Sequence, residues 1–343
     1  MLCAAAARPQ TIVEFPLPGP NSQPGGIAAG PDGDIWITEY GANKIGRLTT
    51  AGAVEDEFPI STSPSTSPGV ILTGPDGNLW FTEFGASPQA NYGNRIGRIT
   101  PIGAITEFTL PGAASQPDGI TIGPDGNLWF VEVSGNKVGR ITPAGAITEF
   151  PIPTPGSRPN YIAMGSDGAL WFNEGSVGKI GRVTTSGSFS EFPMPTPSAV
   201  GGMSAGPDGN VWFTEFNANK IGQITTAGVV TEFPIPTSAS NPGGITVGPD
   251  GALWFTETRG NKIGRITPSG NVTNEYGVPT ANGTPFDITA GPDRNIWFTE
   301  NTGNRVARLQ LSLPNPTPAP KKLKPVPVPT SKDRPHVVPF EGH

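Results

Sequence analysis

The chain has few of the residues on which crosslinked folds and many active sites depend. Its 343 residues include one cysteine, Cys3, and two histidines, His336 and His343. A single cysteine excludes an intrachain disulfide. Residues 11–311 contain no histidine and no cysteine, so this stretch excludes a histidine-bearing catalytic triad and a Cys/His zinc site.

Charge and long apolar runs are also scarce. Only 15% of the residues are charged, against roughly 25% in ordinary soluble domains, and the formal net charge is −6. No basic stripe is present, so no nucleic-acid partner is expected. No apolar run reaches about 18 residues, so no transmembrane segment is expected.

What the chain has in abundance is a repeat of about 42 residues. All seven tryptophans begin the pattern Trp-x-x-Glu, and most repeats place Gly-Pro-Asp-Gly a few residues earlier. The glycines and prolines fall at fixed offsets, which identifies them as turn residues rather than signs of disorder. A sevenfold repeat of this length predicts one closed repeat architecture. The tryptophan–glutamate pairs are Trp36–Glu39, Trp80–Glu83, Trp129–Glu132, Trp171–Glu174, Trp212–Glu215, Trp254–Glu257 and Trp297–Glu300.

One repeat predicts four strands joined by three hairpins. Strands are expected at residues 26–29, 35–39, 44–49 and 54–59, separated by turns rich in glycine. Four such strands make one blade. The fold class is therefore all-β, a seven-bladed β-propeller of four-stranded antiparallel blades.

The hairpin between the second and third strands can be registered from its residues. If Glu39 opposes Lys44, then Trp36 opposes Arg47, and the guanidinium can lie along the indole. The same register places a glycine opposite the large residue that follows the tryptophan. The seven glutamates are then expected to form exposed ion pairs with the Lys or Arg across the hairpin, each contributing little to stability.

Ring closure follows from the fourth strand, Ile-Thr-Glu-Phe-Pro. A copy follows each of the first six repeats but not the seventh, and the remaining copy is at residues 11–16. The N-terminal strand is therefore predicted to close the last blade and remove the open sheet edges. The predicted divisions are a 1–10 extension, an 11–311 propeller and a 312–343 extended tail.

Three segments depart from the repeat. Residues 84–94 form an insertion, either an ordinary surface loop or a lid or specificity loop. The tail has nine prolines, and a linker, an anchor, or an arm that binds a partner or neighbouring subunit all fit it. The stretch 1–7 is similar to the end of a secretory signal, which favours an extracellular or periplasmic location; a frayed terminus is the alternative.

The repeat Gly-Pro-Asp-Gly-Asn-Leu-Trp-Phe-Thr-Glu, followed by Gly-Asn-Lys-Ile-Gly-Arg and Ile-Thr-Glu-Phe-Pro, closely resembles the virginiamycin B lyase (streptogramin lyase) family. The resemblance implies a seven-bladed propeller. It also implies Mg²⁺-dependent ring opening by elimination, with two histidines, an acid and the last blade's Trp-x-x-Glu glutamate. Here that glutamate is Glu300, but Phe286, Thr284 and Gly243 stand at the base, acid and second-histidine positions.

The turns that lead into the innermost strands supply the candidate ligand-binding residues. These turns lie on one face of a propeller, and a concave centre with polar and aromatic residues is the usual ligand site. Glu300 is the candidate metal ligand, with Mg²⁺ or Ca²⁺ as the ion, although no cofactor is required. The candidates are Asp118, Arg158, Asn160, Tyr161, Phe286 and Asp287.

The sequence is compatible with two functions. One is a secreted binding or scaffold protein whose central face takes a protein, a small molecule or a glycan. The other is a metal-dependent lyase or hydrolase of the same family with an altered site, using Glu300 together with Asp287 or Asp118.

Overall fold

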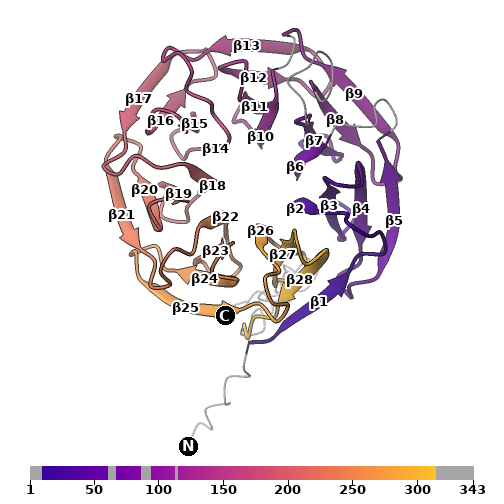
Figure 1. The fold of residues 1–343 in the computed structure, drawn as a ribbon. Coiled ribbons are helices and arrows are strands. Elements are labelled where there is room, and N and C mark those ends of the chain that lie inside the picture. The colour runs from indigo at the N-terminus through magenta and orange to yellow at the C-terminus, as the bar shows by residue number, and fades with distance from the viewer. Residues whose placement is uncertain (1–9, 61–66, 86–93, 113–114, 314–343) are drawn as a thin grey trace, which may run out of the picture. The chain divides into compact units, whose positions relative to one another are not determined.

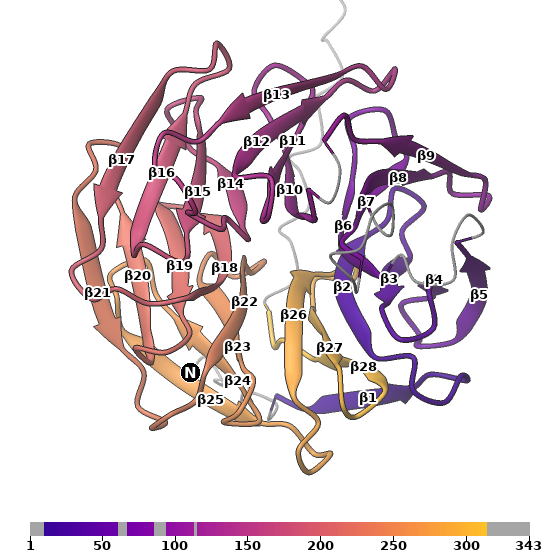
Figure 2. The same cartoon turned by 45° about the horizontal axis from the view of Figure 1, so that its top comes forward.

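The computed structural model describes residues 10–60, 67–85, 94–112 and 115–313. They form seven four-stranded antiparallel sheets arranged in a ring (Figure 1), and the tilted view in Figure 2 shows the innermost strands around the centre. The predicted all-β, seven-bladed propeller is confirmed. The described residues contain no helix that is long and apolar enough to cross a membrane.

Every blade uses its four strands in the same order from the centre outwards. The innermost strands are β2 (Pro24–Ala29), β6 (Pro68–Thr73), β10 (Pro117–Ile122), β14 (Ile162–Met164), β18 (Val200–Ala205), β22 (Pro242–Val247) and β26 (Pro285–Ala290). The second strands are β3 (Ile35–Glu39), β7 (Leu79–Glu83), β11 (Leu128–Glu132), β15 (Leu170–Glu174), β19 (Val211–Glu215), β23 (Leu253–Glu257) and β27 (Ile296–Glu300).

The third and outermost strands complete each sheet. The third strands are β4 (Lys44–Leu48), β8 (Arg95–Ile99), β12 (Lys137–Ile141), β16 (Lys179–Val183), β20 (Lys220–Ile224), β24 (Lys262–Ile266) and β28 (Arg305–Leu309). The outermost are β5 (Val54–Pro59), β9 (Ile105–Thr109), β13 (Ile147–Pro151), β17 (Phe189–Pro193), β21 (Val230–Pro234), β25 (Val272–Gly277) and, in the last blade, β1 (Ile12–Pro16).

The predicted hairpin register is confirmed in the first blade. Glu39 faces Lys44 and Trp36 faces Arg47 in the antiparallel ladder. In the second blade the glycine of this hairpin, Gly97, leaves room for a ring, because a Cβ atom there would overlap Phe81. This is the role predicted for glycine at that position.

Each tryptophan is held by an aspartate and a stacked aromatic ring, and in six of the seven blades also by an arginine. In the second blade the indole Nε1 of Trp80 donates to Asp76 Oδ1 at 2.9 Å, so the buried N–H is satisfied. The ring stacks on Phe108 at a centroid distance of 5.4 Å, and the guanidinium of Arg98 lies 5.5 Å from its centroid. The Asp-Gly turn therefore has two roles: it reverses the chain, and its aspartate binds the indole N–H. Sequence reasoning predicted the arginine but neither the aspartate nor the stacking.

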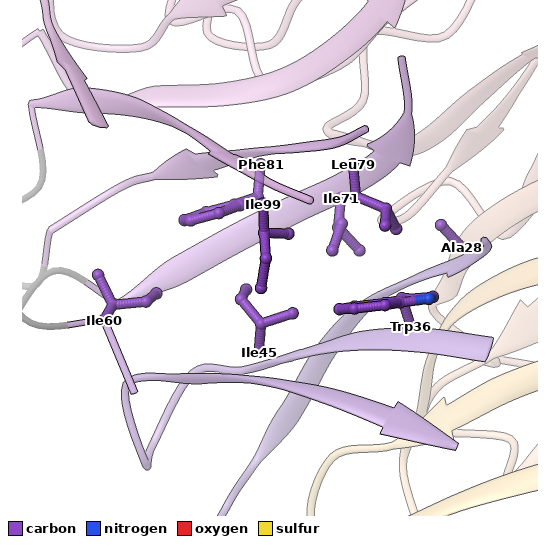
Figure 3. Packing of buried hydrophobic residues seen from close by; sticks show 8 residues of the cluster. All are labelled: Ala28, Trp36, Ile45, Ile60, Ile71, Leu79, Phe81 and Ile99. Atoms are coloured by element: carbon purple, nitrogen blue, oxygen red, sulfur yellow. The ribbon is translucent and has the colours of Figure 1, made fainter. Parts of the chain in front are cut away.

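The hydrophobic core lies between neighbouring blades. Figure 3 shows one such layer, in which Trp36 and Ile45 of the first blade pack with Ile71, Leu79 and Phe81 of the second. Because every blade covers the next, residues on both faces of the second strand are buried, and β3 and its counterparts have no exposed residue. This explains why these strands are apolar at consecutive positions rather than alternating.

The N-terminal strand closes the ring, as predicted. Strand β1 pairs antiparallel with β28. Phe15 stacks on Trp297 at 5.5 Å, which supplies the ring that the outermost strand supplies elsewhere. Glu14 accepts hydrogen bonds from the backbone N–H and hydroxyl of Thr280 at 2.7 and 2.9 Å. Both ends of the ring are therefore held in one sheet.

The compact unit that contains the ring ends at Ser312. Most of the predicted 1–10 extension, residues 86–93 of the insertion and residues 314–343 of the tail lie outside the described residues. The expectations for these segments stay predictions.

Candidate functional site

The innermost strands begin so close together that glycine dominates there. A Cβ atom on Gly26 would lie 2.7 Å from the carbonyl oxygen of Gly69 in the next blade, a distance that real Cβ atoms do not adopt. The first, fifth and sixth blades accordingly present Gly-Gly at this point. The third, fourth and seventh blades present the larger residues instead, Asp118, Asn160, Tyr161, Phe286 and Asp287.

A central cavity of about 400 Å³ opens where the innermost strands begin. Four of the six predicted ligand-binding residues line it: Asp118, Tyr161, Phe286 and Asp287. The remaining lining residues are Gln23, Gly25, Gly26, Tyr40, Pro68, Gly69, Val70, Phe84, Gly119, Ile120, Ile162, Gly201, Gly202, Met203, Gly244, Ile245 and Asn301.

The other two predicted residues do not line the cavity. The amide Nδ2 of Asn160 donates to Asp118 Oδ2 at 3.3 Å, while its backbone N–H donates to Asn173 Oδ1 at 2.8 Å. Asn160 therefore supports Asp118 from the neighbouring blade. Arg158 is exposed in the loop before it, with a left-handed φ of 50°.

The two cavity aspartates differ in how they are held. Both oxygens of Asp287 accept backbone N–H groups, from Ile27 at 3.1 Å and from Ile288 at 2.9 Å, so this side chain bridges the last and first blades. Burial raises the pKa of Asp287 to about 6 against these hydrogen bonds. Burial likewise raises the pKa of Asp118 to about 6; the hydrogen bond from Asn160 opposes this, and the charge of Asp287 adds to it.

Two aromatic residues stand beside the carboxylates. The pKa of Tyr161 is raised above its usual value, first by burial and then by the charges of Asp118 and Asp287. The tyrosine is therefore a neutral phenol at any physiological pH. The Phe286 residue is 44% exposed, and its backbone carbonyl is fixed by a hydrogen bond from Thr256 Oγ1 at 2.9 Å.

Sequence reasoning missed a second tier of lining residues. Tyr40, Phe84 and Asn301 each follow directly after a Trp-x-x-Glu glutamate, and Gln23 precedes the first innermost strand. The signal was present in the sequence, because the residue after that glutamate changes from blade to blade while the glutamate does not.

The prediction of exposed Glu–Lys pairs across the hairpin is wrong. Glu39 and its six counterparts are fully buried beneath the loops. Lys44 instead pairs with Glu57 of the outermost strand, at 2.8 Å, and corresponding pairs occur in other blades. The lysine is long enough to reach past the buried glutamate to the partly exposed one, where both charges keep some contact with water.

Glu300, the candidate metal ligand, does not fit Mg²⁺ in this arrangement. It is fully buried, and a Cβ atom on Gly303 would lie 2.8 Å from its Oε2, so the loop covers the carboxyl group. Burial, followed by the charge and hydrogen bonding of the neighbouring Glu14, raises its pKa to about 8. Magnesium requires several oxygen ligands around an accessible site. No group of three His, Cys, Asp or Glu side chains suited to a metal occurs in the described part of the chain.

The other positions implied by the resemblance have structural neighbours of their own. Thr284 donates its hydroxyl hydrogen to Thr302 Oγ1 at 2.8 Å within the loop. Gly243 accepts a hydrogen bond from Thr214 Oγ1 at 2.7 Å, and a Cβ atom there would lie 2.7 Å from Thr256 Oγ1. A histidine at position 243 would therefore require its neighbours to move.

Solved structures with this fold include lyases. A streptogramin B lyase structure is 39% identical, with a TM-score of 0.82, covering 89% of this chain and 99% of that one. Virginiamycin B lyase from Staphylococcus aureus is 41% identical, with a TM-score of 0.81, covering 88% and 99%. A catalytically inactive histidine-to-alanine variant of the Staphylococcus aureus enzyme, with quinupristin, is 40% identical, with the same TM-score and coverage.

The search of curated proteins gives no match. The sequence model of the Virginiamycin B lyase family matches residues 7–200 and 145–341, which together span nearly the whole chain. Taken with the identities to the solved lyases, this match shows that the chain belongs to the Virginiamycin B lyase family.

Proposed function

We propose that this member of the family is a binding protein that uses the central cavity for a small molecule and does not catalyse streptogramin ring opening. The observation that carries the proposal is the contrast within one face. The cavity is open and lined by Tyr161 and Phe286, whereas Glu300 is buried. Phe286 also stands at the position that the resemblance to the family assigns to the general base.

A phenyl ring can neither accept a proton nor bind a metal ion. Loss of a general base costs roughly 10²–10⁴ in rate. The same ring contributes apolar area to a ligand site, where aromatic side chains supply much of the binding energy. Replacement of a histidine by Phe286 therefore favours binding over turnover.

The direct test is a ring-opening assay with quinupristin and Mg²⁺, comparing the purified protein with a Glu300→Gln variant. We expect no linear product above the variant's background. Ring opening that depends on both Mg²⁺ and Glu300 would overturn the proposal in favour of an altered metal-dependent lyase or hydrolase. The Staphylococcus aureus enzyme serves as the positive control.

Binding is tested separately with a fragment library observed by ligand-detected NMR. The variant Val70→Tyr fills the cavity with the residue that the fourth blade carries at the equivalent position, Tyr161. Fragments that bind the native chain and lose binding in this variant support the central cavity; binding unaffected by the variant contradicts it.

The proposal includes an extracellular or periplasmic location, for which residues 1–7 are the only indication. A tagged full-length chain followed by cell fractionation tests it. The tail and the 84–94 loop are the segments to delete in a search for a macromolecular partner.

A further inference from the structure

The central cavity has an unusual balance of charge. Its lining, among the described residues, includes Asp118 and Asp287 but no lysine, arginine or histidine. Its aromatic side chains are Tyr40, Phe84, Tyr161 and Phe286. A cavity with two acidic groups and several aromatic rings differs from an ordinary apolar pocket, in which a few neutral polar groups orient the ligand.

Asp118 is the carboxylate with unused hydrogen-bonding capacity. Its Oδ2 accepts one long bond of 3.3 Å from Asn160, and within the described residues Oδ1 accepts none. Asp287 instead has both oxygens engaged by the backbone N–H groups of Ile27 and Ile288. Asp118 is therefore available to a ligand, while Asp287 adds negative potential from the opposite side of the ring.

A ligand with a positive charge would relieve both of the costs that Asp118 bears. Burial removes water from the carboxylate, and the second carboxylate repels it; a cation offsets both effects with a charge-assisted hydrogen bond. Aromatic rings add to the attraction, because the electron-rich face of a ring stabilises a nearby cation. A ligand with a carboxylate group would instead be repelled by Asp118 and Asp287.

We propose that the central cavity selects an organic ammonium ion, whose N–H groups bind Asp118 while its apolar part contacts Tyr161 and Phe286. This inference rests on the proposed function, since it requires the cavity to bind a small molecule. It adds the chemical class of that ligand and its anchoring residue.

The test uses three compounds with one skeleton and different charge: phenethylammonium, 2-phenylethanol and 3-phenylpropanoate. Their dissociation constants are measured by NMR titration at pH 7.5 and low salt. We expect phenethylammonium to bind at least about tenfold more tightly than 2-phenylethanol, and 3-phenylpropanoate more weakly than either, because one such contact contributes a factor of about ten or more.

The variant Asp118→Asn should bring phenethylammonium to the affinity of 2-phenylethanol and leave the latter unchanged. Asparagine already occupies the equivalent place in the fourth blade, as Asn160, so the exchange suits the fold. The matched control is Asp56→Asn, on the outer strand β5, where the carboxylate pairs with Arg47 at 3.0 Å. It should change none of the three affinities.

The outcomes separate the two proposals. Equal binding of the ammonium and the alcohol, or an unchanged affinity in Asp118→Asn, overturns the ammonium class while the binding function stands. No binding of the ammonium also overturns it, and the fragment screen with Val70→Tyr then decides whether the cavity binds small molecules at all.

Discussion

The interfaces between blades and the centre of the ring follow opposite rules. On the face of each sheet that packs against the next blade, the same contacts recur within the blade: an indole, an aspartate from the preceding turn and a ring from the outermost strand, as in Trp80, Asp76 and Phe108. At the centre no two of the third, fourth and seventh blades carry the same pair of residues at the start of the innermost strand. Repetition therefore marks what the fold requires, and variation marks where function can differ.

The fifth blade shows how closely the contacts around each tryptophan are kept. It lacks the arginine beside the indole, yet Gln223 donates to Asp208 Oδ2 at 2.6 Å, so the aspartate that binds Trp212 keeps a donor from the third strand. The centre shows no such compensation: three blades simply present Gly-Gly. A change at the interfaces should consequently cost stability, and a change at a varied central position such as Asp118 or Phe286 should alter binding at little cost in stability.

The largest expected effect is removal of the closing strand. Deleting residues 1–17 removes β1, with the Phe15–Trp297 stack and the Glu14–Thr280 hydrogen bonds, and exposes the edge of β28. We expect a lower melting temperature and concentration-dependent association through that edge. Differential scanning calorimetry and light scattering measure the two effects. A chain that ends at residue 313 is the control and should melt like the full chain.

A substitution at a single interface between blades should lower stability by less than removal of the closing strand. Replacing Trp254 by alanine opens a cavity in a fully buried layer and leaves Asp250, which accepts its N–H at 3.0 Å, without that donor. Truncation of a buried large aromatic residue costs about 3–5 kcal/mol. Urea unfolding followed by fluorescence measures the change. An exposed apolar residue provides the control: Ile102→Ser, at a position that is 89% exposed, should change little, and equal losses in the two variants would contradict the comparison.

The fold was predictable because each turn and strand signal occurs seven times. One Gly-Pro-Asp-Gly turn is weak information, but seven at a constant spacing from Trp-x-x-Glu define the blade, and the misplaced copy at residues 11–16 defines the closure. The repeat does not predict which side chains reach one another across a blade. The aspartate of the turn reaches the indole four residues later, and Lys44 reaches past Glu39 to Glu57, and neither contact is visible in strand register alone.

The candidate site was predictable in part for the same reason. Asp118, Tyr161, Phe286 and Asp287 stand out as departures from the repeat, and all four line the cavity. Asn160 departs equally, but its side chain, just before β14, donates to Asp118 of the neighbouring blade, and this contact cannot be read from the repeat. The buried state of Glu300 was not predictable, since a charged residue at a strand end normally reaches solvent.

The last expected effect concerns how stability changes with pH, and it distinguishes the buried glutamates of the second strands from the glutamates of the outermost strands. Burial, followed by the charge of Glu275, raises the pKa of Glu257 to about 8, against 4.5 when unfolded. Below pH 4.5 both states hold the proton and the stabilisation is complete; between pH 4.5 and 8 only the folded state holds it, so stability falls as pH rises. The variant Glu257→Gln stays neutral and should lose less stability between pH 5 and 9.

Glu191 is the matched residue on an outermost strand. Burial acts to raise its pKa, but hydrogen bonds from Lys179 and Thr154 outweigh this and lower the pKa. Its contribution is therefore lost as pH falls through its folded pKa, and Glu191→Gln should differ from the native chain mainly in how its stability changes below pH 4.5. Melting temperatures at half-unit steps from pH 3 to 9 record both slopes, and an alkaline slope unchanged by Glu257→Gln would show that this carboxyl group is ionised in the folded ring.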